Sequence, residues 1–200
     1  MVINPPVLYP GTPVVLVSSV NEDGTTNLAP MSSAWALGRT AVLGLGLEGQ
    51  TFRNLSSRPD CVLNYASASL WEAVERLAPL TGASPVPAAK AAQFRTERDK
   101  FGAAGLTPVA GDLVAADRVA ECPFQIEARV LDARALSTGD AGVVEVEVLR
   151  VHVHSELAEP DLRHVRVDEW EPLFYVFRHY IGRGKELGRT FRATTSRASA

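Results

Sequence analysis

Short runs of apolar and β-branched residues, separated by turn signals, recur along the chain and predict a mainly β protein. The first run, residues 12–20 (TPVVLVSSV), is followed by Asp23-Gly24, a pair that favours a tight hairpin because both residues tolerate positive φ. We expect the first three strands to form a meander. The later strand-like runs are residues 26–37, 41–47, 61–65, 124–136 and 143–154, and an aromatic segment follows at 172–180.

Two of these runs carry an irregularity. Pro30 lies inside the second run, and a proline cannot donate a ladder hydrogen bond, so this strand is expected at a sheet edge or bulged at Pro30. In residues 143–154 the apolar side chains occupy one face up to Val148 and the opposite face from Leu149. Because side chains alternate between the two faces of a strand, this inversion predicts a bulge, or a crossing between two sheets, near Leu149. Both features are typical of small closed barrels.

Helical spacing of apolar residues is found in the middle third of the chain. Residues 50–57 (QTFRNLSS) place Phe52 and Leu55 three positions apart, which predicts a short helix. Residues 68–104 are expected to form a helical insertion between barrel strands and to lie across the barrel, because they carry too few apolar side chains for a core of their own. The expected parts of this insertion are a helix at 70–77, a proline-containing link at 79–90 and a polar helix at 91–101.

Composition and charge narrow the class of protein. Apolar residues make up 46% of the 200 residues and charged residues 22%, as in an ordinary globular chain, and we expect one domain over 1–193 with a disordered tail at 194–200. The net charge of −3 and the lack of a basic stripe argue against a nucleic-acid partner. No long apolar run or basic leader occurs, so we expect no membrane span and a cytoplasmic location. Cys61 and Cys122, far apart in sequence, are expected to be incidental thiols.

Residues 44–49 (GLGLEG) spell GxGxxG, the glycine pattern of dinucleotide-binding folds. Such a fold alternates strands and helices from its start, whereas the strands before Gly44 are linked by hairpins. The next strand, residues 61–65, is followed by Ala66-Ser67, with no acidic residue to hold a ribose hydroxyl. We therefore reject the Rossmann interpretation.

Thr51 and Asn54 lie at the start of the predicted helix 50–57 and one turn later. A helix N-terminus offers free N–H groups and a positive dipole end to an anion, and a threonine hydroxyl adds a further donor. Thr51 as a plain N-cap is the simpler interpretation. The sequence pattern alone favours the cap over a phosphate site.

Other candidate chemistry is weaker. His152 and His154 lie two apart on one strand face and could ligate a metal, but two ligands without a CxxC or HExxH motif do not make a site. We expect surface or interface histidines and no metal. Ser32-Ser33 has no GxSxG elbow around it, so serine hydrolase chemistry is not expected.

Three segments together resemble the flavin reductase-like family. They are TPVVLVSSVNEDGTTNLAPMSSAWALG, VLGLGLEGQTFRNL and ADRVAECPFQIEARVLD. The resemblance runs in order over about residues 11–184, and its most specific part is the spacing between TNLAPMSS and TFRNL. It implies an FMN-binding split β-barrel with Greek-key-like connections.

The resemblance also implies a set of flavin-binding residues. The strand around Pro30 would run past the edge of the isoalloxazine ring, with backbone amides bonded to the ring, and Thr51 and Asn54 would hold the phosphate. Lys100 matches a lysine often found near the flavin, although a solvated helix charge is an equal alternative. Tyr175 matches a closing segment that packs on the flavin or on a partner subunit, whereas core packing is expected for Phe174 and Phe177. The complete set of expected cofactor-binding residues is Asn27, Ala29, Pro30, Met31, Ser32, Ser33, Thr51, Asn54, Lys100 and Tyr175.

The resemblance also implies a function. A reduced nicotinamide, NADH or NADPH, would deliver hydride to flavin N5, and the electrons would pass to an acceptor, with no catalytic side chain required. FMN is expected, with FAD as an alternative, in a homodimer that could serve a monooxygenase partner. One departure matters: relatives that use NAD(P)H carry Gly-Asp-His where this chain has Gly139-Asp140-Ala141. Three possibilities stay open: a reductase of diffusible flavin, an enzyme that keeps FMN and reduces its own organic substrate, and an electron carrier.

Overall fold

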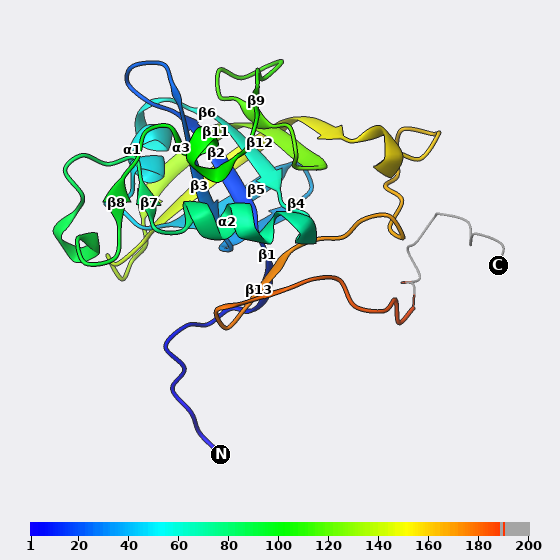
Figure 1. Cartoon of the computed structure of the whole chain (residues 1–200), viewed down its shortest axis with the longest axis horizontal. Coiled ribbons are helices and arrows are strands. Elements are labelled where there is room, and N and C mark those ends of the chain that lie inside the picture. Colours follow the sequence, from blue (N-terminus) through cyan, green and yellow to red (C-terminus); the bar gives the residue numbers. More distant parts are fainter. Residues whose placement is uncertain (189, 191–200) are drawn as a thin grey trace.

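A seven-stranded antiparallel sheet forms the body of the protein in the computed structural model, which describes residues 1–188 and 190 (Figure 1). The expected tail at 194–200 lies outside the described residues. In spatial order the strands are β3 (Thr26–Met31), β2 (Val15–Val20), β6 (Asp60–Tyr65), β11 (Phe124–Ala135), β12 (Gly142–Val153), β5 (Thr40–Leu45) and β4 (Ala34–Leu37).

The strands β3 and β4 are consecutive in sequence but lie at opposite ends of this order. Ser32-Ser33 joins them, and the Gly44 N–H donates to the Ser33 carbonyl at 2.7 Å. The three runs pair in succession as the predicted meander, because the run 26–37 pairs by its first half with β2 and by its second half with β5. The break at Ser32-Ser33 places the two halves at opposite ends of the strand order, which local periodicity did not indicate. The prediction for Pro30 is confirmed, because β3 is an edge strand.

The expected irregularity at Leu149 is a β-bulge. Glu127 of β11 pairs with Arg150 and Ala128 pairs with Val148, so Leu149 has no partner across the ladder. The extra residue keeps Val151 on the same face as Val148, because their partners Ile126 and Ala128 share one face of β11, as the apolar pattern required.

Helix α1 (Gln50–Ser57) has the predicted bounds, and α2 (Trp71–Leu77) follows the 3-10 turn η1 (Ala68–Leu70). The polar helix expected at 91–101 is wrong. Instead, the short strands β7 (Leu80–Thr81) and β8 (Arg95–Thr96) pair in parallel on either side of η2 (Ala88–Lys90), and helix α3 (Lys100–Ala104) begins later. Asp99 sets this start, because its carboxylate accepts from the Gly102 N–H at 2.9 Å.

The two faces of β2 belong to different parts of the core. Val15 and Val17 pack with Leu43 and Leu63 inside the barrel, whereas Leu16 packs against the helices of the insertion. This division follows from strand alternation. Figure 1 shows α2 lying across the sheet, and the residues that meet on this side are Leu16, Leu28, Val74, Leu77, Phe101 and Ala104. The insertion thus shares a core with the barrel.

A second, three-stranded sheet, which we call the arm, combines the two ends of the chain. Its order is β1 (Pro10–Pro13), β13 (Phe174–Val176) and β14 (His179–Ile181), and Figure 1 shows the N-terminal segment leading away from the barrel beside it. The expected aromatic segment is therefore a hairpin. Its turn residues Phe177 and Arg178 have φ of 44° and 71°.

The remaining elements are short. They are β9 (Pro108–Val109), β10 (Arg118–Val119) and η3 (Ser155–Leu157). Within the described residues, no helix has the length and apolar character needed to cross a membrane.

Candidate functional site

A cavity of about 400 Å³ lies where the barrel edge, the start of α1, the insertion and the arm meet. Its volume is within the range of small-molecule and cofactor sites. Eight of the ten residues expected from the sequence line it: Ala29, Pro30, Met31, Ser32, Ser33, Thr51, Lys100 and Tyr175.

One wall is the edge strand β3 and its continuation. Residues 29–33 line the cavity without interruption. Gly44 lines it beside them, and a Cβ added to Gly44 would lie 3.0 Å from the Ser33 Cβ, so the close approach of these two segments requires glycine. No strand in the described part of the chain pairs with the outer edge of β3, so backbone groups here are available to a ligand.

The first turn of α1 forms a second wall. Gly49 is the N-cap residue and no side chain caps the helix, so the N-cap interpretation of Thr51 is wrong. Thr51 lies inside the first turn, 6% exposed, and its hydroxyl accepts a hydrogen bond from the Asn27 side chain at 3.1 Å. The N–H groups of a first turn have no partner within the helix, and the helix dipole makes this end positive. The wall suits an anion.

Lys100 brings a positive charge to the same cavity. Its side chain is 3% exposed, and it has no hydrogen-bond or ion-pair partner among the described residues. Burial, and then the nearby charge of Lys90, lower the pKa of Lys100 to about 8, while Glu97 acts in the opposite sense. A buried ammonium without a partner is costly, which indicates that an anion completes this site.

Three tyrosines, from the arm and the segment before it, line the opposite part of the cavity wall. The rings of Tyr9 and Tyr175 meet edge to face at 5.5 Å, and those of Tyr175 and Tyr180 lie 5.8 Å apart. The hydroxyl groups of Tyr9 and Ser33 are hydrogen-bonded at 2.6 Å, and Tyr180 donates to Glu75 at 3.0 Å. Burial and the hydrogen bond to Glu75 raise the pKa of Tyr180. This wall offers aromatic faces to a planar ligand.

The structure places the other two expected residues behind the cavity wall. The Asn54 amide donates to Ser19 and Asn21 and accepts from Gln50 and Arg58, so both of its polar atoms are engaged within the protein. Asn54 therefore secures α1 against the barrel. Asn27 is 1% exposed and supports Thr51, and its Oδ1 is a buried atom without a hydrogen-bond partner.

Sequence reasoning missed several lining residues. Gly44, Gly46 and Gly49 of the GxGxxG pattern all line the cavity, so the glycine spacing did mark a close approach, although in a barrel and not in a Rossmann fold. No sequence signal placed Tyr9 or Tyr180 at this cavity, whereas Tyr175 was expected there from the resemblance. The other missed residues that matter below are Gln50, Lys90 and Phe94.

The two histidines face different partners. His152 Nε2 lies 2.6 Å from a Glu127 oxygen, and His154 Nε2 lies 2.9 Å from the Ala120 carbonyl. Ligand atoms of Asp112, Glu127 and His152 lie within 4.8 Å of one another. Arg150 and Arg118 supply positive charge to this group, at 2.7 and 3.7 Å from Asp112. The cluster is therefore an ion network that ties the loop around Asp112 to β11 and β12.

Comparison with known proteins agrees with this geometry. The profile of the flavin reductase like domain matches residues 10–182. The chain belongs to the flavin reductase-like domain family. Its curated relative YdfE of Bacillus subtilis (strain 168), an uncharacterized protein, is 43% identical over 195 residues, which are 96% of this chain and 94% of that one.

Solved structures show the same fold. Flavoredoxin of Desulfovibrio vulgaris (Miyazaki F) superposes with a TM-score of 0.79 at 21% identity, covering 98% of this chain and 99% of that one. Nitrilotriacetate monooxygenase component B from Bacillus cereus gives 0.74 at 18%, covering 92% and 89%. The predicted split barrel is confirmed, and at these identities the likeness concerns the fold alone.

Proposed function

We propose that this protein is an FMN-dependent oxidoreductase of the NAD(P)H:flavin reductase type. One observation carries the proposal: a single cavity joins a free strand edge, a helix N-terminus, a buried unpaired lysine and an aromatic wall. These features match the ring edge, the phosphate and the ring face of FMN. FAD is the alternative flavin.

Different residues would hold different parts of the cofactor. Residues 29–33 would face the ring edge, Thr51 and Lys100 with the first turn of α1 would hold the phosphate, and Tyr175 would pack on the ring. Bound flavin supplies the redox chemistry, accepting a hydride from NAD(P)H and passing electrons to an acceptor. The protein would bind and orient it. No side chain is assigned as acid, base or nucleophile.

An electron carrier is the second candidate function. The turn Gly139-Asp140-Ala141 precedes Gly142, which pairs with the cavity residue Leu45, so it lies near the site and lacks the histidine of NAD(P)H-using relatives. The fold shared with a flavoredoxin is compatible with this role.

Anaerobic mixing of FMN-loaded protein with NADH and then NADPH separates the two functions. Loss of absorbance near roughly 450 nm, the oxidised flavin band, is expected with at least one donor. Retained absorbance with FMN bound would favour the carrier, and failure to bind any flavin would contradict both.

We also propose a homodimer, for which the arm and the segment before it offer exposed apolar residues, among them Leu8, Phe177 and Ile181. Sedimentation analysis at micromolar protein tests it; a monomer at every concentration contradicts it. A monooxygenase partner and a cytoplasmic location remain predictions.

A further inference from the structure

The insertion carries a loop, residues 82–94, that reaches the cavity from outside the barrel. We call it the outer loop. Its base is closed by the β7–β8 pairing and by the bond from the Thr96 hydroxyl to the Ala83 carbonyl at 2.8 Å. Between Ala88 and Gln93 every residue is exposed except Lys90, which lines the cavity together with Phe94.

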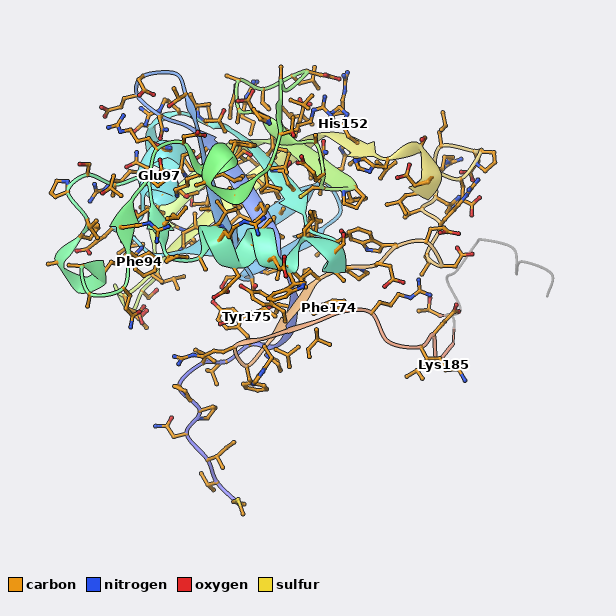
Figure 2. All side chains as sticks on the ribbon, in the orientation of Figure 1. Phe94, Glu97, His152, Phe174, Tyr175 and Lys185 are labelled. Atoms are coloured by element: carbon orange, nitrogen blue, oxygen red, sulfur yellow. The ribbon has the colours of Figure 1, made fainter. Side chains whose placement is uncertain are left out.

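The Lys90 ammonium lies over the glycine turn that leads into α1. A Cβ added to Gly46 or Gly49 would be 3.9 or 3.8 Å from Lys90 Nζ. The Phe94 ring supports the same ammonium at 5.4 Å from the ring centroid. Figure 2 shows Phe94 on this loop, well apart from Tyr175 on the arm.

Two lysines from separate elements therefore line one cavity: Lys90 lies beside the start of α1, and Lys100 of α3 feels the charge of Lys90. No carboxylate in the described part of the chain forms an ion pair with either Lys90 or Lys100, whereas arginine side chains elsewhere, such as Arg98 and Arg150, are paired with aspartates. Lys90 and Lys100 also repel each other, since Lys90 contributes to the low pKa of Lys100. A dianion between the two charges would stabilise this arrangement.

We propose that Lys90 and Lys100 form a two-lysine clamp for the terminal phosphate of FMN, and that the outer loop makes this flavin a resident cofactor and not a diffusible substrate. The inference rests on the proposed flavin site. A phosphate monoester carries close to two negative charges at neutral pH, which the two ammonium groups match. Because Lys90 lines the cavity from a loop closed at its base, release of FMN would require this lysine to give up the phosphate.

Flavin titration of the apoprotein tests the clamp, with quenching of flavin fluorescence as the signal. FMN, FAD and riboflavin, which lacks the phosphate, are compared on the wild type, Lys90→Gln and Lys90→Arg. Arg95→Gln is the matched control, because it removes an exposed positive charge beside the outer loop that does not line the cavity. Thermal unfolding of each variant checks that the fold is intact.

Lys90→Gln is expected to weaken FMN binding by about 10- to 100-fold, the range for hydrogen bonds to charged groups. It should speed FMN release by a similar factor and leave riboflavin binding unchanged. Lys90→Arg should retain most of the FMN affinity, and Arg95→Gln should change it by less than about twofold. Wild-type protein is expected to keep its flavin through dialysis and to prefer FMN to FAD.

Equal losses of FMN and riboflavin affinity in Lys90→Gln would overturn the clamp, as would an equal effect of Arg95→Gln. Equal affinity for FMN and FAD would overturn the assignment to a terminal phosphate, and loss of flavin on dialysis would overturn the resident cofactor. In each of these cases flavin still binds, so the proposed function stands. Binding of no flavin would overturn both.

Discussion

The two ends of the cavity are built in opposite ways. At the cationic end, Lys90, Lys100 and the first turn of α1 bring together donors and charges without hydrogen-bond or ion-pair partners within the described chain, although the Phe94 ring supports Lys90. At the aromatic end, Tyr9 is bonded to Ser33 and Tyr180 to Glu75, and the rings pack on one another. The aromatic end, whose hydroxyl groups already have hydrogen-bond partners, loses little stability without a ligand. An unpaired buried charge, in contrast, favours a bound anion.

The comparison predicts different ligand selectivity at each end. Changes at the cationic end should affect FMN but spare riboflavin, because the two flavins differ only in the phosphate. Changes at the aromatic end should affect both flavins equally, because the ring is common to both.

Lys100→Met is expected to have the largest effect. It should weaken FMN binding by about 100-fold, at the upper end for a buried hydrogen bond to a charged group, and leave riboflavin affinity within a few-fold. The apoprotein should become more stable at pH 7, because a buried unpaired charge is removed. Fluorescence titration and thermal unfolding measure the two effects; a matched loss of riboflavin affinity would place Lys100 at the ring.

The pH dependence should sharpen the same contrast. With a pKa of about 8 in the free protein, Lys100 is mostly charged below pH 8 and loses its proton above it. FMN affinity should therefore fall above pH 8, by up to about tenfold per pH unit, until the raised pKa of the complex is reached. Riboflavin affinity and the Lys100→Met variant should show no such fall between pH 7.5 and 9.

The same lysine makes the apoprotein depend on pH in the opposite sense. The folded pKa lies below the unfolded value, so the unfolded chain holds more protons between about pH 8 and 10.5. The free energy of unfolding should rise over this interval relative to that of Lys100→Met. Denaturant titrations at pH 7.5 and 9.5 compare the two proteins, and parallel curves would contradict the low pKa.

Tyr175→Ala is expected to have the smaller effect at the aromatic end. Loss of one aromatic contact, about 0.5–1.5 kcal/mol, should weaken FMN and riboflavin alike by several-fold. Tyr9→Phe, which removes the hydroxyl bonded to Ser33 but keeps the ring, is the matched control and should change affinity less. If Tyr175→Ala weakened the affinity for FMN but not for riboflavin, this result would contradict the different ligand selectivity of the two ends.

Much of the barrel could be predicted from the chain. Pro30 required an edge or a bulge, and the inverted apolar pattern at Leu149 required a bulge or a crossing between two sheets, because both follow from local backbone geometry. The prediction of a helix at 91–101 is wrong because this polar segment has no apolar periodicity, so tertiary contacts determine its secondary structure. There the parallel pairing of β7 and β8 decided the path of the chain.

The candidate site divides in the same manner. Residues 29–33 and Thr51 could be found from the sequence, since they lie in contiguous segments that resemble the family. Asn54, in the same motif, proved to be engaged in holding α1, because its neighbours Ser19, Asn21 and Arg58 come together only in the folded chain.

The sequence by itself determined the class of fold, the edge strand and the helix that begins beside the cavity, because periodicity, proline and glycine act within a few residues. Only the tertiary structure decided that Lys90 from the outer loop and Lys100 from α3 line one cavity, and that Tyr9 meets Tyr175 across almost the whole chain. Charge and aromatic contacts depend on distances in space, and no local pattern specifies them.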